Sequence, residues 1–326
     1  ALRPAPPPVP PTQAVVVPTP PRPAAPTPGP SGAPPRPDAG WRRAVYVLTA
    51  GLVNVGETPL QQRRRELIDR ISGSTPDCHR IAVISLKGGV GKTTMSVCLG
   101  AVLASTRSDR VIAVDANPDR GTLSGKVTPQ TTATVRDLLE RIDDIASYGD
   151  IRRYTSQSPD RLEILVSSAD PTQSDAFGEH DYRRVVHALE DYYSVVVTDC
   201  GTGLLHSAMS GVLDLADQLV VVSTTSVDGA NSASATLDWL QAHGHADLVR
   251  GAVAVVNAVV PGSGNVDQER LAAHFASRCR AVVRIPHDSH LEAGAEVELS
   301  ALERPTRDAL LAFAAEVVTA IPAGRG

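Results

Sequence analysis

The chain has 326 residues and a formal net charge of −5, which is unevenly distributed. Residues 1–76 hold nine arginines and four acidic residues, so this stretch carries +5 and residues 77–326 carry −10. An acidic folded part argues against a broad electrostatic grip on DNA. No apolar run is long enough to span a bilayer, and the four cysteines show no C-x-x-C or Cys/His pairing. We therefore expect a soluble cytoplasmic protein whose cysteines are small core residues.

The first 76 residues differ in composition from the rest. Residues 1–40 contain 16 of the 26 prolines, and we expect a disordered Pro/Ala-rich tail that is partly polyproline II. Residues 41–76 are expected to form a connector, in which Thr58-Pro59 opens an arginine-rich amphipathic helix. The run Arg63-Arg64-Arg65 has two interpretations: a solvated helix face, or a contact with an acidic partner or an anionic lipid surface. One side of this helix would hold Leu60, Leu67, Ile68 and Ile71.

From His79 onward, short runs rich in Val and Ile alternate with helical patterns, which is typical of repeated βα units. Strands that are apolar throughout indicate a sheet covered by helices on both faces. The predicted fold is a doubly wound α/β domain over residues 77–322, with a mainly parallel sheet flanked by helices. The predicted strands span 80–86, 110–115, 161–166, 194–199, 218–223, 252–257 and 281–285.

Two helices are predicted from their end signals and apolar stripes. Thr134 begins one of them, Asp137 completes a capping box, and the apolar stripe runs on to Ile145. The last helix, from about Thr306 to Ala320, is apolar almost all round and has no basic face. We expect it to pack on the core and not to act as a membrane tether.

Residues 87–94 read K-G-G-V-G-K-T-T and lie between a predicted strand and a predicted helix. This is the setting of a phosphate-binding loop, in which glycines turn backbone amides toward the β- and γ-phosphates at a helix N-terminus. In such a loop Lys92 neutralises the phosphates, and the Thr93 hydroxyl ligates Mg²⁺. The sequence therefore predicts a site for ATP and Mg²⁺, formed by Gly88, Gly89, Val90, Gly91, Lys92, Thr93 and Thr94.

The loop departs from the standard spacing. Leu86 stands where the usual motif has glycine, and a second lysine, Lys87, leads the loop. This pattern resembles the deviant phosphate loop of the ParA/MinD family of ATPases. In that family the first lysine reaches across a nucleotide-sandwiched dimer to the partner's phosphates. The resemblance implies this role for Lys87, and with it a nucleotide-dependent homodimer that hydrolyses ATP to ADP and phosphate.

Two further segments support the resemblance. Asp115-Ala116-Asn117-Pro118-Asp119 follows a predicted strand and is similar to the family's first switch, D-x-D-P. Residues 195–201, V-V-V-T-D-C-G, resemble the Walker B strand and second switch, which implies that Asp199 holds the Mg²⁺ shell through water. Helix capping is the other explanation for Asp199. The metal ligands implied are Thr93, Asp115 and Asp199, and the implied catalytic residues are Lys87, Lys92, Asp115, Asn117 and Asp119.

Two loops match the segments that surround the base in these ATPases. One follows the strand Val255-Val256-Asn257, and the other reads Ile285-Pro286-His287-Asp288. The candidate adenine contacts are therefore Asn257, Pro286, His287 and Asp288. Asn and Pro also simply end strands, and His287 has the alternative of an ordinary polar loop residue.

Asn117 is a departure from the family pattern. The family commonly has an acid here that positions the attacking water, and an amide cannot take a proton. Because phosphoryl transfer depends mainly on positioning and charge stabilisation, Asn117 could still orient water. Slow hydrolysis is the expectation, with Asp119 as an alternative residue for this role.

Within this family, residues 60–320 resemble the EspI-like group of MinD-type ATPases of actinobacterial type VII (ESX) secretion loci. The shared features include Arg64-Arg65-Glu66-Leu67-Ile68, Ser226-Val227-Asp228-Gly229-Ala230 and Pro286-His287-Asp288-Ser289-His290. The resemblance implies a cytosolic ATPase switch that regulates secretion through secretion-system proteins. Two alternatives stay open: a nucleotide-gated binding module with little hydrolysis, and a ParA-type ATPase that positions DNA or cargo.

Overall fold

The computed structural model describes residues 58–73, 75, 77–117, 121–167, 177–203, 207–260 and 268–319. The expected Pro/Ala-rich tail, most of the expected connector and Asp119 lie outside the described residues. Over the described part of the chain, no helix is both long and apolar enough to cross a membrane.

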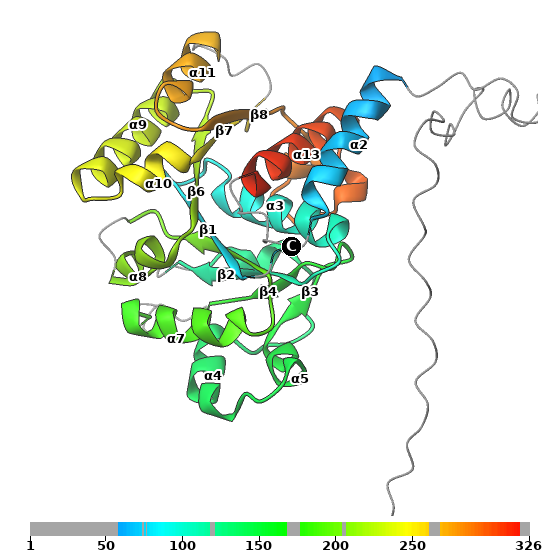
Figure 1. The fold of residues 1–326 in the computed structure, drawn as a ribbon, viewed down its shortest axis with the longest axis vertical. Coiled ribbons are helices and arrows are strands. Elements are labelled where there is room, and N and C mark those ends of the chain that lie inside the picture. Colours follow the sequence, from blue (N-terminus) through cyan, green and yellow to red (C-terminus); the bar gives the residue numbers. More distant parts are fainter. Residues whose placement is uncertain are drawn as a thin grey trace, which may run out of the picture. The chain divides into compact units, whose positions relative to one another are not determined.

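The centre of the molecule is an eight-stranded sheet (Figure 1) with the strand order β3-β4-β2-β5-β1-β6-β7-β8. Every neighbouring pair is parallel except β3 and β4, which are antiparallel. The strands are β1 His79–Ile84, β2 Val111–Ala116, β3 Ser156–Gln157, β4 Glu163–Leu165, β5 Val195–Cys200, β6 Gln218–Thr224, β7 Val253–Asn257 and β8 Ala281–Ile285. The doubly wound α/β prediction is confirmed. The seven predicted strands are present, and β3 escaped prediction because two polar residues carry no apolar pattern.

Helices cover both faces of the sheet, which explains why the strands are apolar on both sides. One core cluster joins the sheet to α3 and α13, and the other joins the opposite face to α4, α7, α8, α9, α10 and α11. The longer helices are α2 Pro59–Ile71, α3 Lys92–Thr106, α7 Glu179–Glu190, α8 Ser207–Leu215, α9 Val227–Ala242, α11 Gln268–Ala276 and α13 Arg304–Val318. The short ones are α4 Val135–Glu140, α5 Tyr148–Ile151, α10 Ala246–Gly251 and α12 Ser289–Glu292.

Helix α2 lies beside α13 (Figure 1) and belongs to the same compact unit, which begins at Pro59. Ile71 is fully buried, and Leu67 and Ile68 pack partly against the core. Leu60 departs from the predicted apolar side, because its side chain is 52% exposed. The first turn of α2 therefore has an apolar residue that the described part of the protein covers only about half.

The capping box at Thr134 is present as predicted: the Asp137 amide donates to the Thr134 side chain, and the Thr134 amide donates to the Asp137 carboxylate at 2.7 Å. The helix ends at Glu140, earlier than the apolar stripe suggested. Ile142 and Ile145 follow in a short 3₁₀ segment and its end, where they still pack partly on the core. The apolar stripe thus marks the buried side of the chain and not the length of the helix.

Candidate nucleotide site

The loop after β1 is shaped by two glycines with left-handed backbone conformations. Gly89 has φ 74° and Gly91 has φ 88°, where a side chain would be strained. Gly91 precedes α3 and supplies no side chain to cap it, so the first amides of this helix are available to an anion. Asn257 donates from Nδ2 to the Val90 carbonyl at 3.0 Å, and a Cβ on Gly91 would lie 2.3 Å from that nitrogen. Asn257 thereby supports the loop from β7.

Asp199 is the centre of a buried polar cluster at the start of α3. Its side chain is fully buried, and Lys92 Nζ donates to Oδ1 at 2.9 Å. The Thr93 hydroxyl donates to Oδ2 at 2.6 Å, and the Ser96 hydroxyl donates to Oδ1 at 3.0 Å. A buried carboxylate is tolerated only when it is paired and hydrogen-bonded. The β5 strand and α3 together meet this condition.

Asp115 lies beside Asp199, because the parallel register of β2 and β5 pairs these two residues directly. It is fully buried, and it accepts hydrogen bonds from the amides of Asn117 at 3.0 Å and Leu123 at 3.4 Å. Burial, and next the charge of Asp199, raise the pKa of Asp115 to about 7. Gly121 lies close above it, since a Cβ there would be 2.2 Å from the Asp115 carboxylate.

These residues fit a magnesium ion and a phosphate group. Mg²⁺ prefers oxygen ligands and keeps several waters, and the cluster offers the Thr93 hydroxyl with the carboxylates of Asp199 and Asp115. Lys92 brings a positive charge to the same place. The Thr93 hydroxyl also shares a 2.6 Å hydrogen bond with that of Thr122, which connects α3 to the segment after β2.

Asn117 and Lys87 flank this cluster. The side chain of Asn117 is half-buried, and its backbone amide is held by Asp115. Lys87 Nζ lies 3.6 Å from the Asp228 carboxylate in an exposed ion pair. An exposed pair of this kind is worth at most about 1 kcal/mol, so it leaves Lys87 able to change partners. The Ser85 hydroxyl donates to the Lys87 carbonyl at 2.7 Å and fixes the backbone at this point.

The residues predicted to contact the base differ in their surroundings. Asn257 contacts the phosphate loop, as described above. Asp288 is buried and caps α12, and its oxygens accept from the amides of His290 at 3.0 Å and Glu303 at 2.9 Å. His287 Nε2 lies 3.0 Å from the Glu292 carboxylate, and Pro286 directly follows β8. The 286–288 segment is thus a loop whose Asp288 side chain accepts hydrogen bonds from backbone amides.

Four residues of the site had no place in the sequence prediction: Ser96, Gly121, Thr122 and Asp228. Ser96 could have been found, because it is four residues after Lys92 on the predicted helix and therefore on the same face. The other three could not, since they reach the site through loops and through the pairing of distant strands.

A family model described as "AAA domain" matches residues 78–249 of the chain. The ESX-1 secretion-associated protein EspI of Mycobacterium tuberculosis (strain H37Rv) is 36% identical over 278 residues, which cover 85% of this chain. The chain spans only 41% of the length of EspI.

Solved structures of the same fold include a ParA family ATPase from Chlorobium tepidum, with a TM-score of 0.62 and 17% identity over 73% of this chain and 98% of that one. Another is the septum site-determining protein MinD from Pyrococcus horikoshii, solved with Mg-ADP, with a TM-score of 0.58 and 21% identity. It aligns with 74% of this chain and 96% of its own. The chain belongs to the AAA domain family, as a ParA/MinD-like member similar to EspI.

Proposed function

We propose that the protein is an Mg-ATP-binding switch that hydrolyses ATP slowly. The observation that carries this proposal is the buried cluster of Lys92, Thr93 and Asp199 beneath a phosphate loop with two left-handed glycines. A lysine, a hydroxyl and a carboxylate at a helix N-terminus are what phosphoryl binding requires. The proposed ATPase domain covers residues 77–322.

The residues would divide the work by their positions. The amides at the start of α3 and the ammonium of Lys92 bind the phosphates, and Thr93 and Asp199 hold the metal shell. Mg²⁺ held there would supply neutralisation of phosphate charge. Lys92 Nζ has three N–H donors, of which Asp199 takes one, so the ammonium can also donate to a phosphate. Asn117 would orient the attacking water without accepting its proton, and we therefore expect slow turnover.

We further propose that the ATP-bound form is a homodimer that regulates type VII secretion. Lys87 supports the dimer, since its exposed ion pair with Asp228 leaves the ammonium near the surface. The similarity to EspI, a secretion-associated protein, supports a role in secretion. Secretion-system proteins are the proposed partners, and the cytosol is the proposed location.

Asn117 also favours a second function, a nucleotide-gated interaction module with little hydrolysis. The two functions share ATP binding and differ only in turnover. In both, the dimer would form around ATP; in the second, release of nucleotide and not hydrolysis would reset it.

Phosphate release under saturating Mg-ATP tests the first function against the second. We expect wild type to exceed Lys92→Ala by at least tenfold, because the lysine neutralises charge that develops in the transition state. The Asn117→Asp variant tests whether a missing proton acceptor limits hydrolysis. If it does, this variant should hydrolyse ATP faster than wild type. Binding of a fluorescent ATP analogue, measured on the same variants, separates lost binding from lost hydrolysis.

Turnover of wild type no higher than that of Lys92→Ala, with wild type still binding ATP more tightly than the variant, would leave only the gated module. Equal ATP binding by wild type and Lys92→Ala would contradict both functions, since the loop would then not be the phosphate site.

A further inference from the structure

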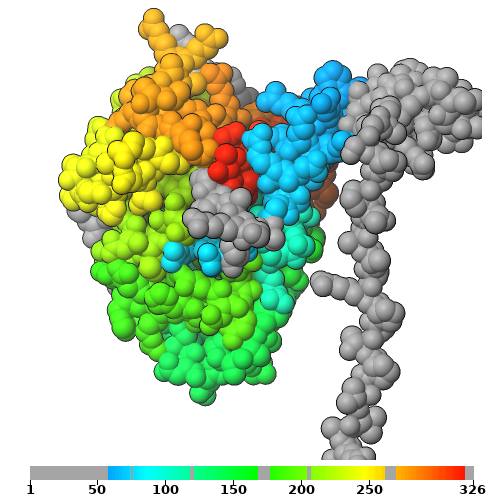
Figure 2. Space-filling model, viewed as in Figure 1, coloured from blue at the N-terminus to red at the C-terminus, as the bar shows by residue number. Residues whose placement is uncertain are grey.

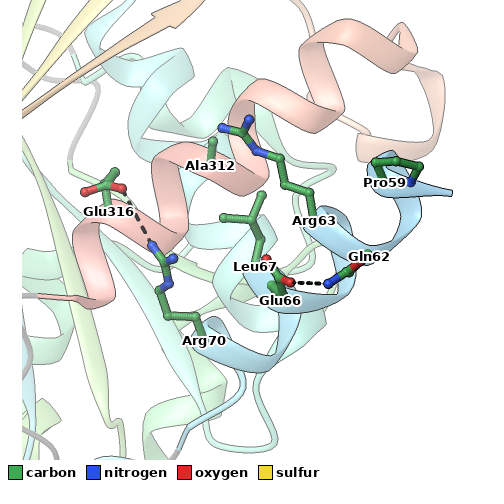
Figure 3. A pocket seen from close by; sticks show the side chains of 8 residues that line it. All are labelled: Pro59, Gln62, Arg63, Glu66, Leu67, Arg70, Ala312 and Glu316. Carbon is green, nitrogen blue, oxygen red and sulfur yellow. Dashed lines mark hydrogen bonds and ion pairs between the residues drawn. The ribbon is translucent and has the colours of Figure 1, made fainter. Parts of the chain in front are cut away.

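Helix α2 borders three hollows along α13 that play no part in the nucleotide site. Figure 2 shows α2 on the surface next to α13. The hollow in Figure 3 has a volume of about 500 Å³, and polar side chains contact one another within it: Arg70 forms an ion pair with Glu316 at 3.7 Å, and Gln62 donates a hydrogen bond to Glu66 at 3.0 Å. The lining carries both signs of charge, Arg63 and Arg70 with Glu66 and Glu316, so this hollow offers no surplus charge to select a charged partner.

A second hollow, on the other side of α2, is different in character. It lies between α2, the C-terminal end of α3 and α13, has a volume of about 320 Å³, and is here named the α2 groove. Its lining contains apolar side chains and two arginines and no acidic residue. The residues that define it are Arg64, Ile68, Val102, Leu299, Arg307 and Leu311.

The two arginines of the α2 groove have no salt-bridge or side-chain hydrogen-bond partner within the described part of the chain. Arg64 is exposed and Arg307 is half-buried. Most arginines near them do have partners: Arg70 pairs with Glu316, and Arg304 lies 4.0 Å from Asp308. Two free guanidinium groups above an apolar floor match a ligand that combines carboxylates with aliphatic side chains.

A neighbouring hollow adjoins the α2 groove. A third hollow of about 290 Å³ shares Arg64 and Leu311 with it and is bordered by Leu60, the exposed leucine of the first turn of α2. An elongated apolar channel with basic groups along it fits a helical segment better than a compact small molecule. A flat anionic membrane fits less well, because the apolar lining of the groove is recessed: Val102 is 4% exposed and Leu311 is 8% exposed, so a planar surface would not reach them.

We propose that the α2 groove binds an acidic amphipathic helix of a partner protein, with its carboxylates on Arg64 and Arg307 and its aliphatic side chains on the apolar floor. The groove contains Val102, Ser105 and Thr106, at the far end of α3 from the phosphate loop. A 15-residue helix is roughly 22 Å long, so partner and nucleotide would bind at separate places. The proposal is independent of the proposed ATPase function.

The test uses the full chain and a labelled synthetic peptide of about four helical turns, with leucines at helical spacing and glutamates between them. Fluorescence anisotropy should show saturable binding to wild type. Arg64→Glu/Arg307→Glu should weaken binding roughly tenfold or more, because two attractive pairs become repulsive. The matched control, Arg141→Glu/Arg153→Glu, reverses two exposed arginines on the other face of the sheet and should bind as wild type does.

Peptides with lysine in place of glutamate, or serine in place of leucine, should bind at least tenfold more weakly. Equal binding by the serine peptide, or equal binding to the Arg64/Arg307 variant, would overturn the proposal. So would binding to phosphatidylglycerol vesicles that depends on these arginines while the peptide does not bind. ATP binding by Arg64→Glu/Arg307→Glu should match wild type, which keeps this result distinct from a failure of the nucleotide site.

Discussion

At the scale of single residues, the site depends on two carboxylates that lie side by side on neighbouring strands. Asp199 has Lys92, Thr93 and Ser96 as partners, whereas Asp115 accepts, among the described residues, from two backbone amides. The two carboxylates therefore differ in their electrostatic environment. Asp199 is compensated by a positive charge, while burial and the neighbouring Asp199 favour the neutral form of Asp115.

The environment of Asp115 predicts a pH dependence of stability in protein that is free of nucleotide and metal. The pKa of Asp115 rises on folding from an ordinary value of 3.8 to about 7. The folded chain therefore binds more protons at this group between these values, and the free energy of unfolding falls as pH rises from about 4 to 7. The full contribution is about 4 kcal/mol. Asp115→Asn cannot titrate and should lack this loss.

Urea unfolding in EDTA at pH 5 and pH 8, for wild type and Asp115→Asn, measures the effect. The comparison with the variant removes the contribution of other groups, such as the buried His79 with its lowered pKa. Two stabilities that change in parallel with pH would show that Asp115 does not titrate in this range.

At the scale of elements, α2 is packed as a core helix along part of its length and is open at its start. Its last residue, Ile71, is fully buried, and the Ile71 carbonyl accepts a hydrogen bond from Arg107 at 3.1 Å. Arg107 is itself buried and held by Asp109. The α2 helix is therefore anchored at its C-terminal end, while Leu60 in its first turn borders the third hollow.

Ile71→Ala should lower the free energy of unfolding by about 2–4 kcal/mol, since it removes a fully buried side chain and leaves a cavity. Leu60→Ala on the same helix should change stability by less than about 0.5 kcal/mol, because the leucine is half exposed. Urea unfolding of the two variants measures this difference. Similar losses of stability in both variants would mean that α2 is anchored along its whole length. No loss of stability in either variant would mean that α2 is not anchored to the core.

At the scale of the whole molecule, the proposed switch requires a second copy of the chain. The loop of Lys87 and the first turn of α9 with Asp228 lie at the same edge of the sheet as the carboxyl ends of β1 and β5. Among the described residues, the Lys87 ammonium has one ion-pair partner, the exposed carboxylate of Asp228. Such a lysine can exchange a carboxylate for a phosphate at little cost.

Mass in solution should therefore double when Mg²⁺ and a non-hydrolysable ATP analogue are added to wild type, and it should stay that of a monomer with ADP. Lys87→Ala should remain monomeric with the analogue while still binding it. Asp228→Asn is the matched control, and it should dimerise at least as readily as wild type because the lost ion pair is weak. Light scattering after size exclusion measures all three. Dimers of Lys87→Ala equal to those of wild type would rule out the proposed role of the lysine.

The sequence by itself determined the sheet, the phosphate loop and the two aspartates at strand ends. Runs of Val and Ile reveal buried parallel strands, and the glycine and lysine spacing reveals the loop, because both depend on residues that are close in the chain. Only the tertiary structure decided that Asp115 and Asp199 are direct neighbours, that Asn257 supports Val90 and that Lys87 meets Asp228. It also decided which arginines of α2 have partners. These contacts join residues up to 167 positions apart, and a local pattern carries no information about a contact that strand order and register create.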